Sequence, residues 1–362
     1  MNKVALNIGS GIYQVPLIKK LKKLGFVVLS TDIDPSAPGL KHSDIKLITN
    51  SHDYKNLYKL IYKKKIKPII IISGAASCLL TSAYLSKKFK LNYLNFKTAN
   101  LISDKNLLSK KYNNHIYIGK YDRKNLIQKK IYKPLVLKIE NYSGGDGIFK
   151  ISNKNDVEKI LKNFPNTKDF ILEKYIQSSH YTIVGQRQKF KTMIFAILKR
   201  KINKDFTTRE IKTIKITKKF YDKIFNYINK MFNDINFDIG NFSIEIFIYK
   251  NRIFLAEIEP SIPGSRIIEL ISKTYKFDIL KYSVELLTKD KIYDSEIKLI
   301  NSGKIIFHRL KKKQNNLILK INKITKRNKN YMYYSFVKHI SSVDKNKFNY
   351  KTTIASELII SK

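Results

Sequence analysis

The first hundred residues alternate short β-branched segments with amphipathic helical segments, and this alternation limits the fold more than any other feature. Residues 4–10 and 27–33 have the composition of strands, and residues 11–25 between them have a helical pattern. Residues 67–74 supply another strand ahead of a helical pattern over 76–89. Strands that alternate with helices pair in parallel, so the sequence predicts an α/β domain built on a parallel sheet.

The pattern changes near Ser103. From there to about Leu299 the strands are longer and antiparallel in character, with one helical pattern over 218–233. This layout is α+β. We therefore predict a parallel-sheet α/β domain over 1–102, a second domain over 103–300, and a small C-terminal extension over 301–362 whose role the sequence does not define. No Pro/Gly/Ser-rich linker marks these boundaries, which rest on the pattern alone.

The net charge of +43 comes from 71 Lys plus Arg against 28 Asp plus Glu, and only eight of the basic residues are Arg. Lysines occur along the whole length together with abundant Ile, Asn and Tyr, as AT-rich coding would produce. A hydrophobic content of 43% excludes a disordered basic tail. Binding to nucleic acid needs basic residues gathered on one face, with Arg favoured for phosphate. The composition therefore favours coding bias, and nucleic acid is not an expected partner.

The cysteine content bears on the cellular compartment. Cys78 stands alone and cannot form an internal disulfide, which fits a reducing cytoplasm. The longest uncharged stretch, residues 68–85, is interrupted by polar residues and glycine. We expect a strand and a helix there and no membrane span.

A glycine turn, Gly9-Ser10-Gly11, follows the first strand, and Asp32 ends the second. A dinucleotide-binding fingerprint requires a third glycine where this chain has Gln14. An ordinary turn between strand and helix is therefore the better interpretation.

A second glycine cluster follows Lys138. Gly144, Gly145 and Gly147 occupy three of four consecutive positions in a chain with only 13 glycines. Such a segment can close its backbone amides over phosphates while the lysine contacts them as a point charge. A plain β-hairpin turn explains the same residues, and both interpretations remain open at this point.

Three acidic residues are spaced for a metal site. Glu245 and Glu257 lie on adjacent strands joined by a polar turn at 249–252, and Glu259 follows two residues later. Carboxylates on one face repel each other unless a cation neutralises them, and oxygen ligands shared with phosphates suit magnesium. The alternative is a solvated acidic face paired with lysines. The apolar strand around Glu257 favours the metal site.

Taken in order, these motifs resemble the ATP-grasp superfamily of carboxylate–amine ligases, especially the branch of biotin carboxylase and carbamoyl-phosphate synthetase. The resemblance covers about residues 1–290, and it implies that residues 1–102 form a Rossmann-like pre-ATP-grasp domain that does not hold the nucleotide. It also implies the sites of ATP and Mg²⁺. The residues expected at the phosphates are Lys105, Lys138, Ser143, Gly144, Gly145 and Gly147. Those expected at the adenine are Glu173, Lys174, Tyr175 and Ile176, with His180 near the ribose. Those expected at magnesium are Glu245, Glu257 and Glu259, the last standing where relatives have asparagine.

One departure concerns catalysis. Ser261 stands where relatives carry the arginine that neutralises the reacting carboxylate. The candidates to replace it are Arg266 on the following loop and the three consecutive cations Lys199, Arg200 and Lys201 on one predicted strand.

The expected function is an ATP- and magnesium-dependent ligase. It would activate a small carboxylate as an acyl phosphate, which an amine or similar nucleophile then attacks. Relatives are often dimers, so a homodimer is a candidate assembly, and the sequence itself does not define the oligomeric state. The alternatives are a non-catalytic ATP-binding protein on the same fold and, from charge alone, a nucleic-acid-binding protein.

Overall fold

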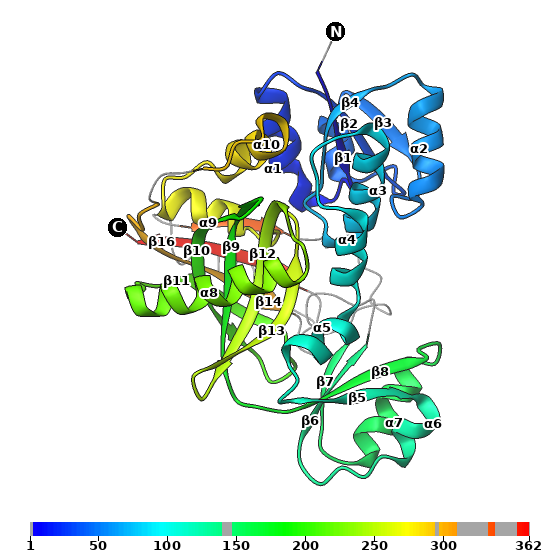
Figure 1. The fold of residues 1–362 in the computed structure, drawn as a ribbon, viewed down its shortest axis with the longest axis vertical. Coiled ribbons are helices and arrows are strands. Elements are labelled where there is room, and N and C mark those ends of the chain that lie inside the picture. Colours follow the sequence, from blue (N-terminus) through cyan, green and yellow to red (C-terminus); the bar gives the residue numbers. More distant parts are fainter. Residues whose placement is uncertain (1–2, 140–146, 294–296, 310–331, 337–352, 362) are drawn as a thin grey trace.

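The computed structural model describes residues 3–139, 147–293, 297–309, 332–336 and 353–361 (Figure 1). The mixed α/β architecture expected from the sequence is confirmed, with three sheets that follow one another along the chain. No helix in the described part of the chain is long and apolar enough to cross a membrane.

The N-terminal unit is a parallel sheet in the order β3-β2-β1-β4. Its strands are β1 (Val4–Ile8), β2 (Val27–Asp32), β3 (Ile45–Ile48) and β4 (Pro68–Ile72). Its helices are α1 (Val15–Lys23), α2 (Tyr54–Lys63) and α3 (Leu79–Phe89), with short 3₁₀ turns η1 (Ile12–Gln14), η2 (Pro38–His42) and η3 (Ala76–Cys78). The predicted alternation is thus confirmed, and β3 is an additional edge strand.

Two helices, α4 (Phe96–Ser103) and α5 (Lys105–Tyr112), lead into a small lobe that lies at the bottom of Figure 1. The lobe is an antiparallel sheet in the order β5-β8-β6-β7 with two helices and a hydrophobic core of its own. Its elements are β5 (Tyr117–Asp122), α6 (Arg123–Gln128), β6 (Leu135–Ile139), β7 (Ile148–Ile151), α7 (Lys154–Asn163) and β8 (Asp169–Lys174).

The third unit is an antiparallel sheet in the order β13-β12-β9-β10-β11-β14-β16-β15. Its strands are β9 (Ser179–Gln188), β10 (Lys191–Ile202), β11 (Thr208–Thr213), β12 (Ile239–Tyr249), β13 (Arg252–Glu259), β14 (Ser302–Arg309), β15 (Met332–Phe336) and β16 (Thr353–Ser361). Its helices are α8 (Lys218–Asp234), α9 (Ile267–Thr274) and α10 (Ile279–Lys289). Strand β14 pairs with β11, so strands of the predicted C-terminal extension continue this sheet. The domain boundaries themselves stay predictions.

The two faces of the large sheet pack against different helices. Helix α8 covers one face over β9, β10, β12 and β13, with Ile224, Ile228 and Phe232 in the core. Helices α9 and α10 pack on the other face, in a core that also includes Leu17 and Ile72 of the N-terminal unit. The N-terminal unit and the large sheet therefore share one core, whereas the small lobe has a separate one.

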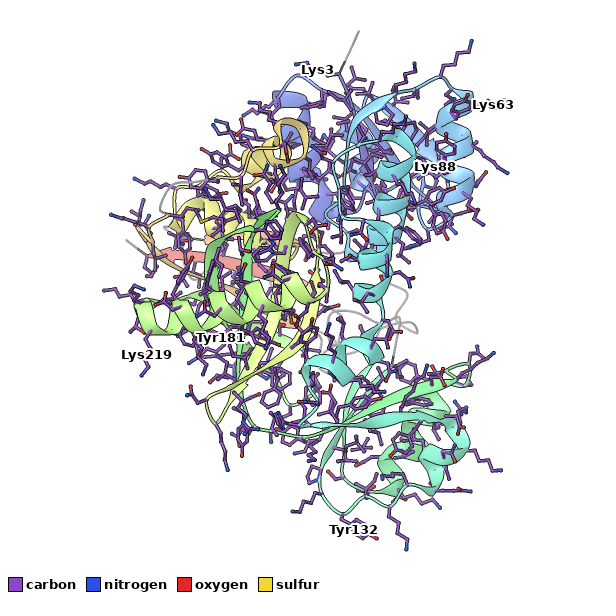
Figure 2. All side chains as sticks on the ribbon, in the orientation of Figure 1. Lys3, Lys63, Lys88, Tyr132, Tyr181 and Lys219 are labelled. Atoms are coloured by element: carbon purple, nitrogen blue, oxygen red, sulfur yellow. The ribbon has the colours of Figure 1, made fainter. Side chains whose placement is uncertain are left out.

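Lysine side chains project from all three units (Figure 2). Lys3, Lys63 and Lys88 extend from the N-terminal unit, and Lys219 extends from the start of α8 on the far side of the molecule. The distribution agrees with the sequence-based view that the lysine excess is a dispersed surface property.

Candidate functional site

The acidic residues meet on one face of the large sheet because of a β-bulge. Glu245 pairs in register with Glu257, and Ser243 pairs with Glu259, so both β13 carboxylates lie on the face of Glu245. The register shifts between Glu245 and Ile246, which leaves Ala256 without a partner on β12. A regular hairpin would have placed Ala256 opposite Glu245 and turned Glu257 to the other face. The bulge is what aims the acids together.

The electrostatics of this cluster fit a cation. Burial, and to a smaller extent the negative charge of Glu257, raises the pKa of Glu259 to about 7, although the positive charges of Arg200 and Lys105 act in the opposite direction. Carboxylates held this close gain from a positive ion between them, and oxygen ligands are those that magnesium prefers. Charged groups from β10, β13 and α5 therefore influence one another here.

The metal site is not complete by itself. Within the described ranges, no three His, Cys, Asp or Glu side chains are grouped so that they could hold a metal ion. Two carboxylates plus substrate phosphates are, however, a common way for proteins to bind magnesium. Glu257 and Glu259 fit such a shared site. The metal-binding roles of Glu245, Glu257 and Glu259 stay predictions.

Arg200 lies on the same sheet face as the acids. Its guanidinium forms an ion pair with Glu245 and donates to Thr182 Oγ1 at 3.2 Å and to Thr208 Oγ1. Only 11% of its side chain is exposed. Strand alternation places the neighbours Lys199 and Lys201 on the opposite face. Lys201 lies 3.3 Å from Glu210 there.

Arg266, the other predicted catalytic cation, has a different setting. It adopts a left-handed conformation (φ 64°) as the residue before α9. Its guanidinium pairs with Glu269 and donates to the backbone oxygen of Ser356 at 3.2 Å. These contacts tie α9 to β16. The geometry therefore favours Arg200 over Arg266, Lys199 and Lys201 as the cation beside the acids, and the catalytic roles of the latter three stay predictions.

The lysine predicted at the phosphates has a buried partner. Lys138 Nζ lies 2.8 Å from Glu173 Oε2, and the carboxylate is 2% exposed. Glu173 also accepts a hydrogen bond from Asn113 Nδ2 at 3.2 Å. Lys105 begins α5, after Asp104 caps that helix by accepting from the Leu107 amide. The two lysines therefore enter the site from different elements.

The predicted phosphate flap is described only in part. Ser143, Gly144 and Gly145 lie outside the described residues. Gly147 adopts φ +71°, which glycine accommodates readily, and its carbonyl accepts from the Ile139 amide at 2.8 Å. Residues 139 and 147 thus approach each other at the ends of β6 and β7.

The segment 175–178, which we call the hinge, joins β8 of the small lobe to β9 of the large sheet. Just before the hinge, the Lys174 amide donates to Ile116 O at 2.8 Å, and at its first residue the Tyr175 amide donates to Pro134 O at 3.2 Å. The Tyr175 ring lies under the ammonium of Lys150 at 4.1 Å. Ile176 packs on a small apolar cluster that includes Phe247.

His180, at the start of β9, faces the same side of the sheet as Arg200, with which it is in register. Its ring stacks on Phe247 at 5.7 Å, and Nε2 lies 3.2 Å from Ser178 Oγ. Burial, and to a smaller extent the positive charge of Arg200, lowers its pKa to about 4. His180 is therefore neutral at pH 7 and can serve as a hydrogen-bonding group. The adenine and ribose contacts stay predictions.

Sequence reasoning missed Asn113. This fully buried residue follows α5 and reaches both Glu173 and the β13 backbone at Leu255. No local pattern marks it, because its side-chain partners lie 60 and 142 residues further along the chain.

The family comparison agrees with this arrangement. Residues 108–265 match the model of the ATP-grasp domain, a range that spans the small lobe, the hinge and the acid-bearing strands. The chain therefore carries an ATP-grasp domain, as its motifs predicted.

Individual relatives extend the match over most of the chain. Formate-dependent phosphoribosylglycinamide formyltransferase of Prochlorococcus marinus is 24% identical over 303 residues, covering 75% of this chain and 72% of that protein. L-amino acid ligase from Bacillus licheniformis has a similar structure, with a TM-score of 0.80 and 11% identity over 99% of this chain and 93% of that one. The biotin carboxylase domain of Hydrogenobacter thermophilus 2-oxoglutarate carboxylase, solved with MgADP, ADP and bicarbonate, has a TM-score of 0.72 and 13% identity over 99% and 86%. At these identities the two structures show a shared fold.

Proposed function

We propose that this chain is an ATP- and magnesium-dependent ligase that activates a small carboxylate as an acyl phosphate for attack by an amine or similar nucleophile. One observation carries the proposal. The charges of Glu257, Arg200 and Lys105 all act on Glu259, so acidic residues and cations from three elements meet at one point of the sheet.

The chemistry needs these residue types. The substrate carboxylate oxygen attacks the γ-phosphorus and ADP leaves, after which the nucleophile attacks the acyl carbon and phosphate leaves. Lys105 and Lys138 would neutralise phosphate charge, and Arg200 would stabilise the negative charge on the reacting carboxylate. Bound magnesium, held by Glu257 and Glu259, would supply further charge neutralisation at the phosphates. His180, neutral at pH 7, would contact the ribose.

Support also comes from the relatives. One is named as formate-dependent and another as an L-amino acid ligase, and a third was solved with MgADP. Formate and amino acids are therefore the first carboxylates to test here. The single cysteine agrees with a cytoplasmic enzyme, and a homodimer remains part of the proposal.

The test couples binding to turnover. Isothermal titration with Mg²⁺ and a non-hydrolysable ATP analogue should show saturable binding. Phosphate release should then rise when formate or pooled L-amino acids are supplied with pooled amines. Glu257→Gln should abolish this release with the fold retained by circular dichroism. Full activity of that variant would refute the assignment.

A second candidate is a non-catalytic ATP-binding protein, because Ser261 stands where relatives carry an arginine. Ser261 is buried, with 8% of its surface exposed, and cannot supply charge. Nucleotide binding without phosphate release from any carboxylate pool would favour this candidate.

A further inference from the structure

Asn113 joins three elements that carry the candidate site. Its side chain is fully buried, and its backbone ends α5, whose first residue is Lys105. Its Nδ2 group donates to Leu255 O at 2.7 Å and to Glu173 Oε1 at 3.2 Å. Its Oδ1 accepts from the Leu255 amide at 2.9 Å.

The Asn113 side chain bonds to Leu255 as a neighbouring β-strand would. Strand β13 is at the edge of the large sheet, so one side of its backbone has no neighbouring strand among the residues that the structure describes. The Asn113 amide pairs with both the N–H and the C=O of Leu255, as a peptide of an adjacent strand would. A buried edge peptide without these bonds would cost about 1–3 kcal/mol per unsatisfied group.

This contact lies next to the β-bulge that turns Glu257 to the face of Glu245. Leu255 packs toward α8, and Ala256 is the extra residue of the bulge. Glu257 therefore points to the opposite face from Leu255, although regular alternation would place both on one face. By fixing the peptide of Leu255, Asn113 holds β13 where the bulge begins.

The contact with Glu173 concerns Lys138, the lysine predicted to bind phosphate. Glu173 uses Oε1 for Asn113 and Oε2 for Lys138. A carboxylate held at both oxygens has one orientation, so the ammonium of Lys138 is directed as well. One amide thus reaches toward both the metal-ligand candidates and the phosphate lysine.

We propose that Asn113 is a positioning residue that sets Glu257 and Lys138 relative to each other for binding of the magnesium–nucleotide complex. The proposal rests on the proposed function. It requires only that nucleotide and metal bind between these groups, and it assigns Asn113 no contact with either.

The test compares Asn113→Ala and Asn113→Asp with Thr98→Val. Thr98 is also buried, and its hydroxyl donates to Ile235 O at 2.9 Å, away from the acids. Its removal therefore controls for the loss of a buried hydrogen bond to backbone. The probe is a non-hydrolysable ATP analogue with Mg²⁺, titrated calorimetrically at a temperature where circular dichroism shows every variant folded.

Asn113→Ala should weaken analogue binding about tenfold, the equivalent of one lost hydrogen bond, and should raise the Mg²⁺ concentration needed for half-maximal binding. Asn113→Asp should weaken it further, because a carboxylate would face Glu173 and Leu255 O. Thr98→Val should lower the melting temperature, but its analogue affinity and its Mg²⁺ concentration for half-maximal binding should stay within about twofold of wild type.

Binding by Asn113→Ala within about twofold of wild type, with unchanged Mg²⁺ dependence, would overturn the proposal. If neither Asn113 variant folds while Thr98→Val does, Asn113 is a structural residue and the positioning role is refuted. Wild-type protein that does not bind the analogue would refute the proposed function itself, so the two failures are distinguishable.

Discussion

Replacement of Arg200 tests whether the face of the large sheet on which a cation lies decides its role in the reaction. Lys199, Arg200 and Lys201 are consecutive cations on β10, and only Arg200 faces the acids. We expect Arg200→Ala to lower ATP turnover with a carboxylate substrate by about 10²–10³-fold, the usual loss when a group that stabilises transition-state charge is removed. Lys199→Ala and Lys201→Ala should each retain turnover within about twofold.

The stability change of these variants follows from burial. Breaking a buried ion pair costs about 3–5 kcal/mol when one charge is left behind. The Arg200 side chain is 11% exposed, but that of Glu245 is 29% exposed, so water can solvate part of the remaining charge. We therefore expect Arg200→Ala to lose about 2–3 kcal/mol of unfolding free energy. Lys201→Ala removes a pair that is mostly exposed on the lysine side and should cost at most about 1 kcal/mol.

The assays are phosphate release at saturating Mg²⁺ and urea denaturation followed by circular dichroism. Arg200→Lys is a useful intermediate, because it keeps the charge and loses the fork that reaches both threonines. The reasoning is refuted if Arg200→Ala retains full turnover. It is equally refuted if either lysine variant is as impaired as Arg200→Ala, since the sheet register would then not decide function.

Three further predictions concern the same protein. Glu257→Gln should remove the Mg²⁺ dependence of nucleotide binding, measured by calorimetry with and without the metal, because a neutral amide attracts the cation less. The pKa of His180 is about 4 when folded and about 6.5 when unfolded, so the unfolded state takes up the proton first as the pH falls. Between pH 7 and pH 5, protonation of His180 in the unfolded state should therefore lower the unfolding free energy of wild type by about 2 kcal/mol. His180→Asn should not show this part of the loss in urea titrations, and equal pH profiles of the two proteins would contradict this. Arg187→Met should lower unfolding free energy by about 3 kcal/mol, because the buried guanidinium bonds to Phe237 O, Thr192 and Asn229, while analogue affinity stays unchanged.

The N-terminal sheet could be predicted from sequence because its signals are local. Each of β1, β2 and β4 is a continuous β-branched run next to a helical pattern, and a parallel arrangement follows from the alternation. Strand β3 has only four residues, and Lys46 and Ile48 are exposed, so its pattern is weak. Strand β14 joins the large sheet by pairing with β11, about ninety residues earlier in the chain, and β16 joins it by pairing with β14. Such non-local pairing leaves no periodic signal.

The acid pair was predicted on one face, but the physical reason was absent from the sequence argument. Spacing and an antiparallel hairpin alone do not align Glu245 with Glu257, since the register from Tyr249 and Arg252 reaches Ala256 first. Only the bulge corrects the offset. The local sequence around Ala256 carries no signal for the bulge. The hydrogen bonds from Asn113 beside the bulge come from a residue far away in the chain.

The positions of the few arginines were a useful signal in the sequence, and the total charge did not reveal it. Coding bias toward lysine can act wherever any cation suffices, but lysine cannot reproduce the planar fork of arginine. Arg123 donates to the backbone oxygens of Phe164 and Leu161, and Arg187, Arg200 and Arg266 each bond to at least two partners. Arg209 and Arg252 are exposed, so rarity alone is not sufficient. An arginine between two lysines on a strand is nevertheless the residue to examine first. The neighbouring lysines show that lysine is the usual cation in this chain, so the arginine marks a position where the guanidinium shape matters as well as the charge.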